Sequence, residues 1–323
     1  MSGAVLTAIE HDRGTMAGAS AEALTFGRAL AEQLGVACEA LLIGDGDVGS
    51  LADECARFGA STVHVAAIDW LADYSPETCG DVIAAAAESL SPGAIVACGT
   101  DRGNEMLAHA AAVLDLPFVA NCLDVQPGDD WSVTRVQWGG SLNEEASLSS
   151  RLPLVSVAHH AVEASAAQVD ADVSQLDVTV ADNGRRTMIT DRDVVEGGLT
   201  LATAPVVVGG GRGVGSAEGF TVLEELAKML GGVVGCSRAV TNNGWRPHSD
   251  QVGQTGTRIA PQLYIACGIS GAIQHWVGAK GAKKILAINT DPQANMVVKA
   301  DYAVIGDLFE VVPAITQEPS LNR

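Results

Sequence analysis

Residues 251–276 read QVGQTGTRIAPQLYIACGISGAIQHW, and this stretch decides the fold class that we assign to the chain. It opens with a loop in which Gln251, Gln254 and Thr255 stand among glycines, so side chains that donate and accept hydrogen bonds are carried on flexible backbone. The run Leu263–Cys267 is unbroken apolar sequence and too short for a helix. Such a run is typical of a strand that is buried on both faces of a parallel sheet.

The residues after this run predict a helix that begins beside a ligand. Ser270 is a good N-cap, and the small Gly271 and Ala272 leave the first amides of the helix uncovered. Gln274 and His275 then extend from its first turns. A strand end, a helix start and polar side chains together predict a cleft for an anionic or carbonyl-rich cofactor.

Length and composition predict two globular domains with an acidic surface. The chain has 323 residues, of which 47% are hydrophobic, enough for two domains that each bury a core. Asp and Glu number 39 against 19 Lys and Arg, and the formal net charge of -20 argues against binding to nucleic acid or to an anionic membrane. The first lysine is Lys228, and this depletion predicts a halophilic protein whose carboxylates keep it soluble at high salt.

The cysteines predict buried thiols rather than disulfides or a zinc site, because they are odd in number, form no CxxC pair and have apolar neighbours. The N-terminus has no basic segment ahead of an apolar run, and no apolar run reaches the roughly 18 residues of a membrane span. We therefore expect a cytoplasmic protein. The seven cysteines are Cys38, Cys55, Cys79, Cys98, Cys122, Cys236 and Cys267.

The first half alternates apolar runs with amphipathic segments, a pattern typical of an α/β fold with a doubly wound parallel sheet. Strands are expected at 5–9, 38–43, 62–66 and 94–98, and helices at 21–34, 48–58, 77–89 and 104–114. Ser20 is the expected N-cap of the first helix. Later strands at 133–138, 146–150 and 154–158 are expected to add an antiparallel edge. This first domain, expected over 1–190, ends in an acidic connection that starts near residue 162 and has room for a short strand at 176–180.

Two local features of the first half were candidates for chemistry. Residues 99–103, GTDRG, follow an expected strand and precede an expected helix, so they could cradle a phosphate, but a turn capped by Thr100 or Asp101 is the favoured interpretation. His159 and His160 adjoin each other at an expected strand end, where neighbouring side chains point to opposite faces. The pair is therefore predicted to be a poor metal site, and no metal site is predicted.

The second half opens with VVVGGGRGVGS, residues 206–216, which predicts a buried strand and a glycine-rich loop before a helix at 217–230. No frame of the loop fits GxGxxG, because Val214 occupies the place of the third glycine. The next expected strand is followed by Ser237 and Arg238, with no acid for a ribose hydroxyl. An ordinary NAD-binding fold is therefore disfavoured.

Polar residues follow each of the five strands expected in this second half. Because the carboxyl ends of parallel strands meet at one edge of a sheet, we expect these residues to converge on one rim. Two guanidinium groups on that rim, from Arg212 and Arg238, suit a pyrophosphate and an electron-rich ring. The five strand-end residues are Arg212, Ser237, Ser270, Asn289 and Asp307.

The sequence from residue 206 to the end resembles the FAD-binding domain of the electron transfer flavoprotein alpha subunit. The motifs that carry this resemblance are GGGRG, GCSRAV, QVGQTG, PQLYIACGISGAIQH, INTDP, ADY and GDLFEVVP. The resemblance implies that residues 200–323 form a second doubly wound, Rossmann-like domain that holds FAD. It also implies a heterodimer with a beta subunit, which carries electrons from dehydrogenases, such as the acyl-CoA dehydrogenases of fatty acid oxidation, to a membrane quinone reductase. Such a subunit is an electron carrier, so no catalytic residues are predicted.

The resemblance further implies which residues contact FAD. Arg238 is expected against the flavin ring, Thr255 near its N5 atom and His275 at its O2 atom, so that Arg238 and His275 would stabilise the negative charge that arrives with an electron. The implied contact residues, the last three on the adenosine part, are Arg212, Ser237, Arg238, Val252, Gly253, Gln254, Thr255, Ser270, Gly271, Ala272, Ile273, Gln274, His275, Asn289, Asp307 and Leu308.

Two positions depart from the family pattern, and three alternatives stay open. Thr290 stands where a lysine is common, which puts one contact near the phosphates in question, and Asn295 stands where a proline is common. The chain could instead belong to a flavin-bifurcating complex that oxidises NADH, with a second FAD in the partner subunit. It could also be an NAD-dependent oxidoreductase with a variant loop, or a nucleotide-sensing or scaffolding module built on the first domain.

Overall fold

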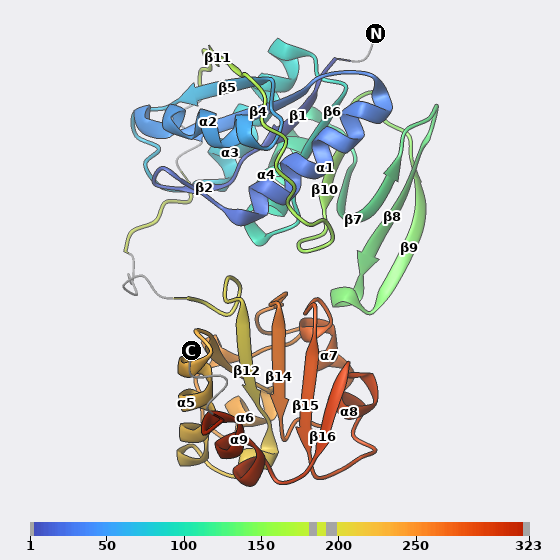
Figure 1. Ribbon diagram of the computed structural model, residues 1–323. Helices are drawn as coiled ribbons and strands as arrows, with labels where there is room; N and C mark the ends of the chain where they lie inside the picture. Colours follow the sequence, from blue (N-terminus) through green and yellow to red (C-terminus); the bar gives the residue numbers. More distant parts are fainter. Residues whose placement is uncertain (1–2, 181–185, 192–198, 319–323) are drawn as a thin grey trace. The chain divides into compact units, whose positions relative to one another are not determined.

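A computed structural model describes residues 3–180, 186–191 and 199–318. The chain divides into two compact units, Met1–Asp193 and Val194–Arg323, which we call the N-terminal and C-terminal units (Figure 1). Within the described ranges, no helix has both the length and the apolar sequence needed to cross a membrane. The limits 1–190 and 200–323 stay a prediction about which parts of the chain fold alone.

The N-terminal unit alternates strands and helices before it turns to strands alone. Its strands are β1 (Val5–Ala8), β2 (His11–Asp12), β3 (Thr15–Met16), β4 (Cys38–Gly44), β5 (Thr62–Ala67), β6 (Ala94–Cys98), β7 (Phe118–Gln126), β8 (Trp131–Gln137), β9 (Leu142–Leu148), β10 (Leu154–Val157) and β11 (Asp172–Gln175). Its helices are α1 (Gly18–Leu34), α2 (Ala52–Arg57), α3 (Pro76–Leu90) and α4 (Asp101–Leu114).

The main sheet of this unit has nine strands in the order β11-β5-β4-β1-β6-β10-β7-β8-β9. The pairs from β11 to β7 are parallel, while β7, β8 and β9 form an antiparallel edge, as predicted. The expected place of β10 in that edge is wrong, because the chain returns from the edge and inserts β10 in parallel between β6 and β7. The strand β7 was not predicted, since Asn121 and Asp124 interrupt its apolar pattern.

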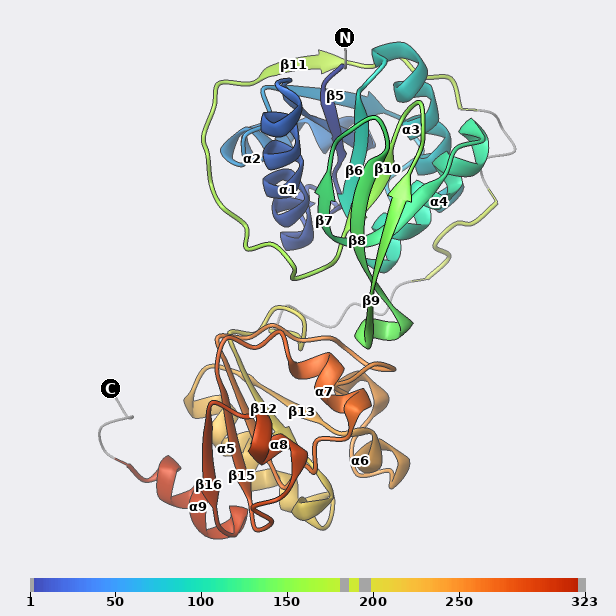
Figure 2. The ribbon, with the colours of Figure 1, turned by 90° about the vertical axis from the view of Figure 1, so that its right-hand side faces the viewer.

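Both faces of this sheet are covered by helices, as a doubly wound fold requires. In β4, Ala40 and Leu42 pack into a core with residues of α1 and α2, whereas Leu41 and Ile43 pack into a second core with residues of α3 and α4. Figure 2 shows the two helix pairs on opposite sides of the sheet. Because successive side chains of a strand point to opposite faces, a continuous apolar run fits this central position.

Two predictions at helix starts have different outcomes. Ser20 is not the N-cap of α1, which begins at Gly18; its hydroxyl instead accepts a hydrogen bond from Glu10 N (2.7 Å) and donates one to Glu10 O (2.9 Å). The turn interpretation of residues 99–103 is confirmed, because Thr100 Oγ1 accepts from Gly103 N at 2.9 Å and caps α4. The same hydroxyl donates to Glu10 Oε1 at 2.6 Å. A carboxylate therefore lies where a phosphate would have to bind.

The argument that His159 and His160 point apart is wrong. The strand β10 ends at Val157, and the two histidines are the central residues of a turn that Ala161 N closes by donating to Ala158 O at 2.9 Å. Their rings stack with centroids 3.6 Å apart. The rule of opposite faces applies only within a strand, so it does not describe this pair.

The chain beyond these histidines returns to the far edge of the sheet. The short strand is Asp172–Gln175 rather than the predicted 176–180, and it pairs in parallel with β5. Leu176, Val178 and Val180 instead pack against the core formed with α3 and α4. Residues 181–185 and 192–198 of the predicted acidic connection lie outside the described residues.

The C-terminal unit is built on a parallel sheet in the order β13-β12-β14-β15-β16. The strands are β12 (Val206–Gly210), β13 (Val233–Cys236), β14 (Leu263–Cys267), β15 (Ile285–Asn289) and β16 (Tyr302–Ile305). The helices are α5 (Thr221–Met229), α6 (Arg238–Asn242), α7 (Ile273–Ala279), α8 (Asn295–Lys299) and α9 (Leu308–Thr316). The sequence predicts all five strands, at the apolar runs that begin at residues 206, 233, 263, 285 and 302.

The strand β14 lies at the centre of this sheet and is buried on both faces. Ile265 and Cys267 pack into a core with residues of α5 and α9, and Tyr264 and Ala266 pack on the other side with residues of α7 and α8. Ser270, predicted as an N-cap, lies before the helix, since α7 begins at Ile273. The position before α7 is Ala272, which has no capping side chain.

The prediction of buried, unpaired thiols is confirmed. All seven cysteines are buried and none forms a disulfide. Burial raises the pKa of the Cys38 thiol to about 11 and that of the Cys267 thiol to about 12, because the thiolate loses its hydration.

Candidate functional site

The carboxyl ends of the C-terminal sheet border a cleft of about 660 Å³. The five strand-end residues that were predicted to converge all line it, which confirms their common rim. Most of the other predicted site residues line it as well. The predicted residues in its wall are Arg212, Ser237, Arg238, Ser270, Gly271, Ala272, Gln274, His275, Asn289, Asp307 and Leu308.

The glycine-rich loop after β12 forms one wall of the cleft by lying directly on the end of β14. Gly211 N donates to Cys267 O at 2.9 Å, and Gly213 N donates to Gly268 O at 3.1 Å. A Cβ atom on Gly211 would lie 2.2 Å from Gly268 O, so this approach of two backbones requires glycine. It brings the exposed side chain of Arg212 to the cleft.

Five predicted residues lie outside the wall of the cleft: Val252, Gly253, Gln254, Thr255 and Ile273. Val252 is buried in the core beneath, while Ile273 is 58% exposed at the start of α7. Thr255 is nevertheless joined to the wall, because Arg238 Nη1 donates to Thr255 Oγ1 at 3.4 Å. The loop thus contacts the cleft wall through the side chain of Arg238.

Gln251 is the residue that orients this loop. It is 2% exposed, and its amide is paired at both ends: Oε1 accepts from Thr241 Oγ1 at 2.8 Å and Nε2 donates to Thr255 Oγ1 at 2.9 Å. A buried amide with both ends satisfied fixes the hydroxyl that it contacts. From the sequence, Gln251 is recognisable only as a polar loop residue, and its place next to the apolar Val252 is the signal for this role.

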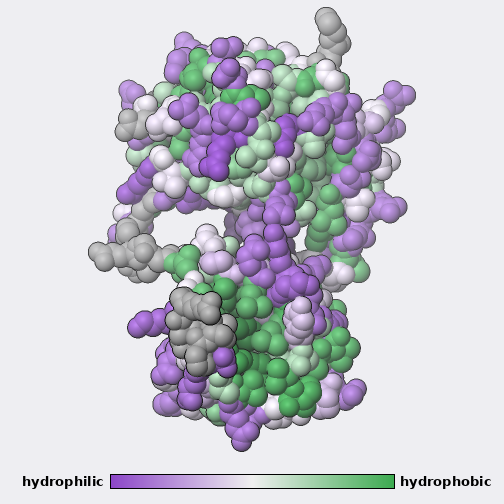
Figure 3. All heavy atoms as spheres, in the orientation of Figure 1, coloured by the Kyte–Doolittle hydropathy of each residue, from purple (hydrophilic) through white to green (hydrophobic). Residues whose placement is uncertain are grey.

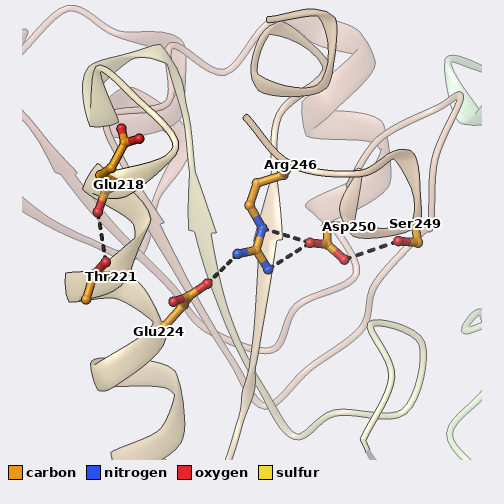
Figure 4. Close-up of polar contacts among 6 residues, drawn as sticks. All are labelled: Glu218, Thr221, Glu224, Arg246, Ser249 and Asp250. Atoms are coloured by element: carbon orange, nitrogen blue, oxygen red, sulfur yellow. Dashed lines mark hydrogen bonds and ion pairs between the residues drawn. The ribbon is translucent and has the colours of Figure 1, made fainter. Parts of the chain in front are cut away.

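An ion network fastens the start of the same loop to α5 (Figure 4). Arg246 forms an ion pair with Glu224 of α5, and its Nε and Nη2 atoms both lie 2.8 Å from Asp250 Oδ2. Its guanidinium carbon lies 5.5 Å from the centroid of the Phe220 ring. Because two nitrogen atoms of Arg246 contact the same carboxylate, the position of Asp250, the residue before Gln251, is fixed.

His275, on α7, is a buried residue of the cleft wall. It is 6% exposed, and its Nε2 lies 2.8 Å from the Tyr264 hydroxyl. Burial lowers the pKa of His275 to about 4, an effect that the backbone of Val252 only partly offsets. At neutral pH the ring is therefore uncharged, so it can stabilise negative charge only through a hydrogen bond.

The second ring nitrogen of His275 is the unsatisfied atom of the site. Among the described residues, Nδ1 is buried and has no hydrogen-bond partner. A buried polar atom without a partner is uncommon, since it lowers stability by about 1–3 kcal/mol. His275 also lines the cleft.

Asn289 and Asp307 each shape the rim as well as lining it. Asn289 Nδ2 donates to Ile269 O at 3.0 Å and joins the ends of β14 and β15. Asp307 caps α9, because its Oδ1 accepts from Phe309 N at 2.9 Å. Their side chains are thus held in place before any ligand arrives.

Several residues of the wall were not predicted as contacts. Most of them lie within two positions of a predicted residue or on α6, so counting a wider window at each strand end would have found most of them. Thr290, noted only as a departure from the family pattern, lines the cleft, whereas Asn295 begins α8. The unpredicted wall residues with polar or bulky side chains are Asn242, Thr290, Asp291 and Phe309.

Comparison with known proteins shows the family to which the chain belongs. Residues 200–280, which contain the glycine loop, the loop at Gln251 and α7, match the family description "Electron transfer flavoprotein FAD-binding domain". Residues 5–181 match "Electron transfer flavoprotein domain". The chain belongs to the electron transfer flavoprotein alpha-subunit family. Its cofactor is FAD, and its function is electron transfer.

The match to this family extends over nearly the whole chain. The chain is 38% identical over 313 residues to "Electron transfer flavoprotein subunit alpha" of Mycobacterium leprae, covering 96% of each protein. It is 35% identical to the protein of the same description from Bacillus subtilis, covering 94% of each. It is also 35% identical to "Protein FixB" of Clostridium saccharobutylicum, covering 95% of this chain and 93% of that protein.

Proposed function

We propose that this electron transfer flavoprotein subunit binds FAD in the C-terminal cleft through the sixteen residues named from the sequence. The observation that carries the proposal is the meeting of all five strand-end residues, with Arg238, around one cleft of about 660 Å³. That volume lies in the range of about 300–1,000 Å³ that is usual for cofactor sites. FAD, when bound, supplies a ring that takes up and releases electrons one or two at a time.

The arginines of the cleft would bind and orient the cofactor. Arg212 and Arg238 carry permanent charges, so they favour the anionic pyrophosphate and any negative charge that reaches the ring. Thr255, held by Gln251 and contacted by Arg238, would direct its hydroxyl to the ring edge. Because Gln251 and Asn289 are already paired within the protein, little ordering remains to be done when the cofactor binds.

His275 would hold a proton at a fixed place. Its ring is neutral at neutral pH, and its orphaned Nδ1 can donate to a carbonyl oxygen if the Nε2 atom accepts from the Tyr264 hydroxyl. Burial of Tyr264 raises its pKa well above its usual range, so the phenol keeps its proton and supports that tautomer. The pair would therefore stabilise charge on the cofactor without itself titrating.

The partner in this proposal is a beta subunit, and the electron donors and acceptor are dehydrogenases, such as acyl-CoA dehydrogenases, and a membrane quinone reductase. An apolar edge of the C-terminal unit supports an interaction with a partner, because β16 exposes Tyr302 (61%) and Ile305 (52%). Figure 3 shows hydrophobic residues over this face of the unit. The family match gives no support to an NAD-dependent oxidoreductase or to a sensing module.

The test is coexpression with the beta-type subunit, followed by a count of flavins per heterodimer and an assay for NADH oxidation. One FAD per heterodimer and no NADH oxidation would support a simple electron carrier. Two flavins with NADH oxidation would identify the alternative, a subunit of the flavin-bifurcating type. A heterodimer that stays colourless when FAD is supplied would contradict the proposal.

A further inference from the structure

Three polar side chains, which we call the amide network, connect α6 to the loop beside the flavin cleft. They are the Thr241 hydroxyl, the Gln251 amide and the Thr255 hydroxyl. Thr241 Oγ1 lies 3.0 Å from Arg238 O and 2.8 Å from Gln251 Oε1. Gln251 Nε2 lies 2.9 Å from Thr255 Oγ1, which also accepts from Arg238 Nη1 at 3.4 Å. Both ends of the amide network therefore reach Arg238.

In the arrangement that these contacts describe, the protons of the amide network are unevenly shared. Thr241 has one hydroxyl proton for two carbonyl oxygens, Arg238 O and Gln251 Oε1. At the other end, Thr255 accepts from Gln251 and from Arg238, so both lone pairs of its oxygen are in use. Towards a ligand, Thr255 can therefore only donate in this first arrangement.

A half-turn of the Gln251 amide gives a second arrangement of the same atoms. Nε2 then donates to Thr241 Oγ1, and the Thr241 proton is left for Arg238 O alone. Gln251 Oε1 accepts the proton of Thr255, whose oxygen keeps one lone pair beyond its contact with Arg238. Towards a ligand, Thr255 can therefore only accept in this second arrangement.

The surroundings of Gln251 permit the half-turn without repacking. The residue is 2% exposed, and its backbone is held on both sides, since Gln251 N donates to His248 O at 3.0 Å and Thr257 N donates to Gln251 O at 2.7 Å. The oxygen and the nitrogen of an amide are nearly equal in size, and the last torsion of a glutamine is broad and roughly two-fold. The directions of the protons change, while the heavy atoms keep their places.

The two arrangements match the oxidised and the reduced flavin. This inference rests on the proposed function, in which Thr255 lies at N5 of the ring. N5 of the oxidised ring has a lone pair and no proton, so it accepts a hydrogen bond. Full reduction adds two electrons from a dehydrogenase and one proton from water, which binds at N5, so that N5 then donates and the ring carries one negative charge. The first arrangement fits the oxidised ring, and the second fits the reduced ring.

We propose that Thr241 and Gln251 are positioning residues that reverse the hydrogen bond between Thr255 and the flavin when the flavin is reduced. The amide turns, the two hydroxyl protons change direction, and no proton leaves the amide network. Without this reversal, the proton on N5 would face the proton of Thr255, and that contact would oppose reduction. The reversal keeps Thr255 paired with the ring in both states.

Thr241 is the residue that makes the second arrangement complete. When Nε2 of Gln251 turns away from Thr255, it needs an acceptor, and Thr241 Oγ1 is the atom at that end. A side chain of the same shape without a hydroxyl would leave a buried N–H unpaired in the second arrangement but only a carbonyl oxygen unpaired in the first. Unpaired buried N–H groups are the rarer of the two. Loss of the Thr241 hydroxyl therefore holds Thr255 as a donor.

The direct test is the infrared difference spectrum between oxidised and reduced FAD in the full heterodimer with the unchanged chain. Glutamine labelled with ¹³C at its side-chain carbonyl is supplied during expression, so that its bands are recognised by their isotope shift. Because the Gln251 carbonyl changes its donor from Thr241 to Thr255, we expect one labelled band to move on reduction. Gln251→Met identifies the residue, since this moving band should be absent from that variant.

Thr241→Val is expected to lower the potential of the electron transfer that places the proton on N5 by about 60 mV, a tenfold change in the equilibrium. Thr241→Ser restores the hydroxyl and should restore the potential. Thr221→Val is the matched control: Thr221 also donates to the carbonyl oxygen three residues before it, Glu218 O at 2.9 Å, but lies on α5 outside the amide network (Figure 4). The control should keep both its potential and its FAD.

Two results would overturn this assignment while the proposed function stands. One is a heterodimer that binds FAD, as its visible absorbance shows, but has no labelled glutamine band that moves on reduction; this result does not depend on whether any variant folds. The other is a potential in Thr241→Val that equals the potential in Thr221→Val. A heterodimer that lacks flavin absorbance when FAD is supplied contradicts both claims, and its lack of colour distinguishes that case.

Discussion

The two units carry parallel sheets whose carboxyl edges differ sharply in the space that they leave. At the edge of the N-terminal sheet, the hollow beside Glu10 and Tyr74 has about 40 Å³, whereas the cleft in the C-terminal unit has about 660 Å³. The first volume holds a few waters at most, and the second is large enough for a cofactor. The architecture alone therefore does not create a binding site.

The difference comes from the residues that follow the strands. Glu10 follows β1, and its half-buried carboxylate accepts from Thr100 Oγ1, while the Tyr74 hydroxyl donates to Arg102 O at 3.2 Å. These side chains fill the N-terminal edge. The residue directly after β12 is Gly211, which has no side chain to fill the edge. Fold class predicts where a ligand can bind, and the first residues after each strand decide whether it does.

The largest effect is expected from a side chain that fills the carboxyl edge of the C-terminal sheet. Gly211→Ala places a methyl group 2.2 Å from Gly268 O and 2.7 Å from Ile269 Cα, and these backbone atoms cannot move aside without distorting the end of β14. We expect loss of most bound FAD and destabilisation of the C-terminal unit by about 1–3 kcal/mol. Flavin absorbance and chemical denaturation measure the two effects. Gly46→Ala, at a glycine of the N-terminal unit with open space around it, is the control and should keep its FAD.

The next effect separates the units by their response to acid. The folded pKa of His275, about 4, lies below its ordinary 6.5, so its contribution to stability is present above pH 6.5 and is lost as the pH falls towards 4. The gap corresponds to on the order of 3 kcal/mol. Urea unfolding of the C-terminal unit between pH 7 and pH 4 should show this loss. His275→Gln should reduce the pH dependence, and an unchanged slope in that variant would contradict the pKa.

A smaller effect is expected from the charge in the cleft. Arg238→Ala should keep much of the FAD but lower the potential for adding the first electron by on the order of 60 mV, a tenfold change in the equilibrium. The reason is that a cation beside the ring stabilises the arriving negative charge. Redox titration measures the potential. Arg238→Lys should fall between the two, and equal potentials in all three proteins would place Arg238 away from the ring.

The smallest effect is expected at the carboxyl edge of the N-terminal sheet, which side chains already fill. Desolvation raises the pKa of Glu10, so its ionised form lowers the stability of the N-terminal unit at neutral pH. Glu10→Gln keeps an acceptor for Thr100 and should change stability by less than about 1 kcal/mol, towards greater stability. It should create no second flavin site. A loss of several kcal/mol on denaturation would show that the carboxylate itself is required.

The sequence predicted the carboxyl edge of the C-terminal sheet better than that of the N-terminal sheet. Runs such as LYIAC mark buried strands directly, and the residues after them must lie at one rim, so Arg212 and Asn289 could be placed without coordinates. The position of β10 could not be predicted, because hydrophobic pattern reports burial and not the order of strands in space. Adaptation to high salt stays a prediction.

Contacts within the site were beyond sequence reasoning for a different reason. The pairing of His275 with Tyr264 depends on the distance between a strand and the helix after it, which residue spacing does not give. The role of Gln251 depends on Thr241, ten positions away on a separate helix. At His160, a positive φ overrode the expected geometry of a strand end. Local patterns predict elements, and contacts between elements need the fold.

The burial of all seven cysteines has a consequence for a chain that carries a flavin. Reduced flavins pass electrons to dissolved oxygen and release hydrogen peroxide, which converts accessible thiolates to sulfenic acid. Here the thiols are shielded and, with pKa values such as about 12 for Cys267, stay protonated. The cysteine thiols are therefore protected from peroxide that the flavin produces.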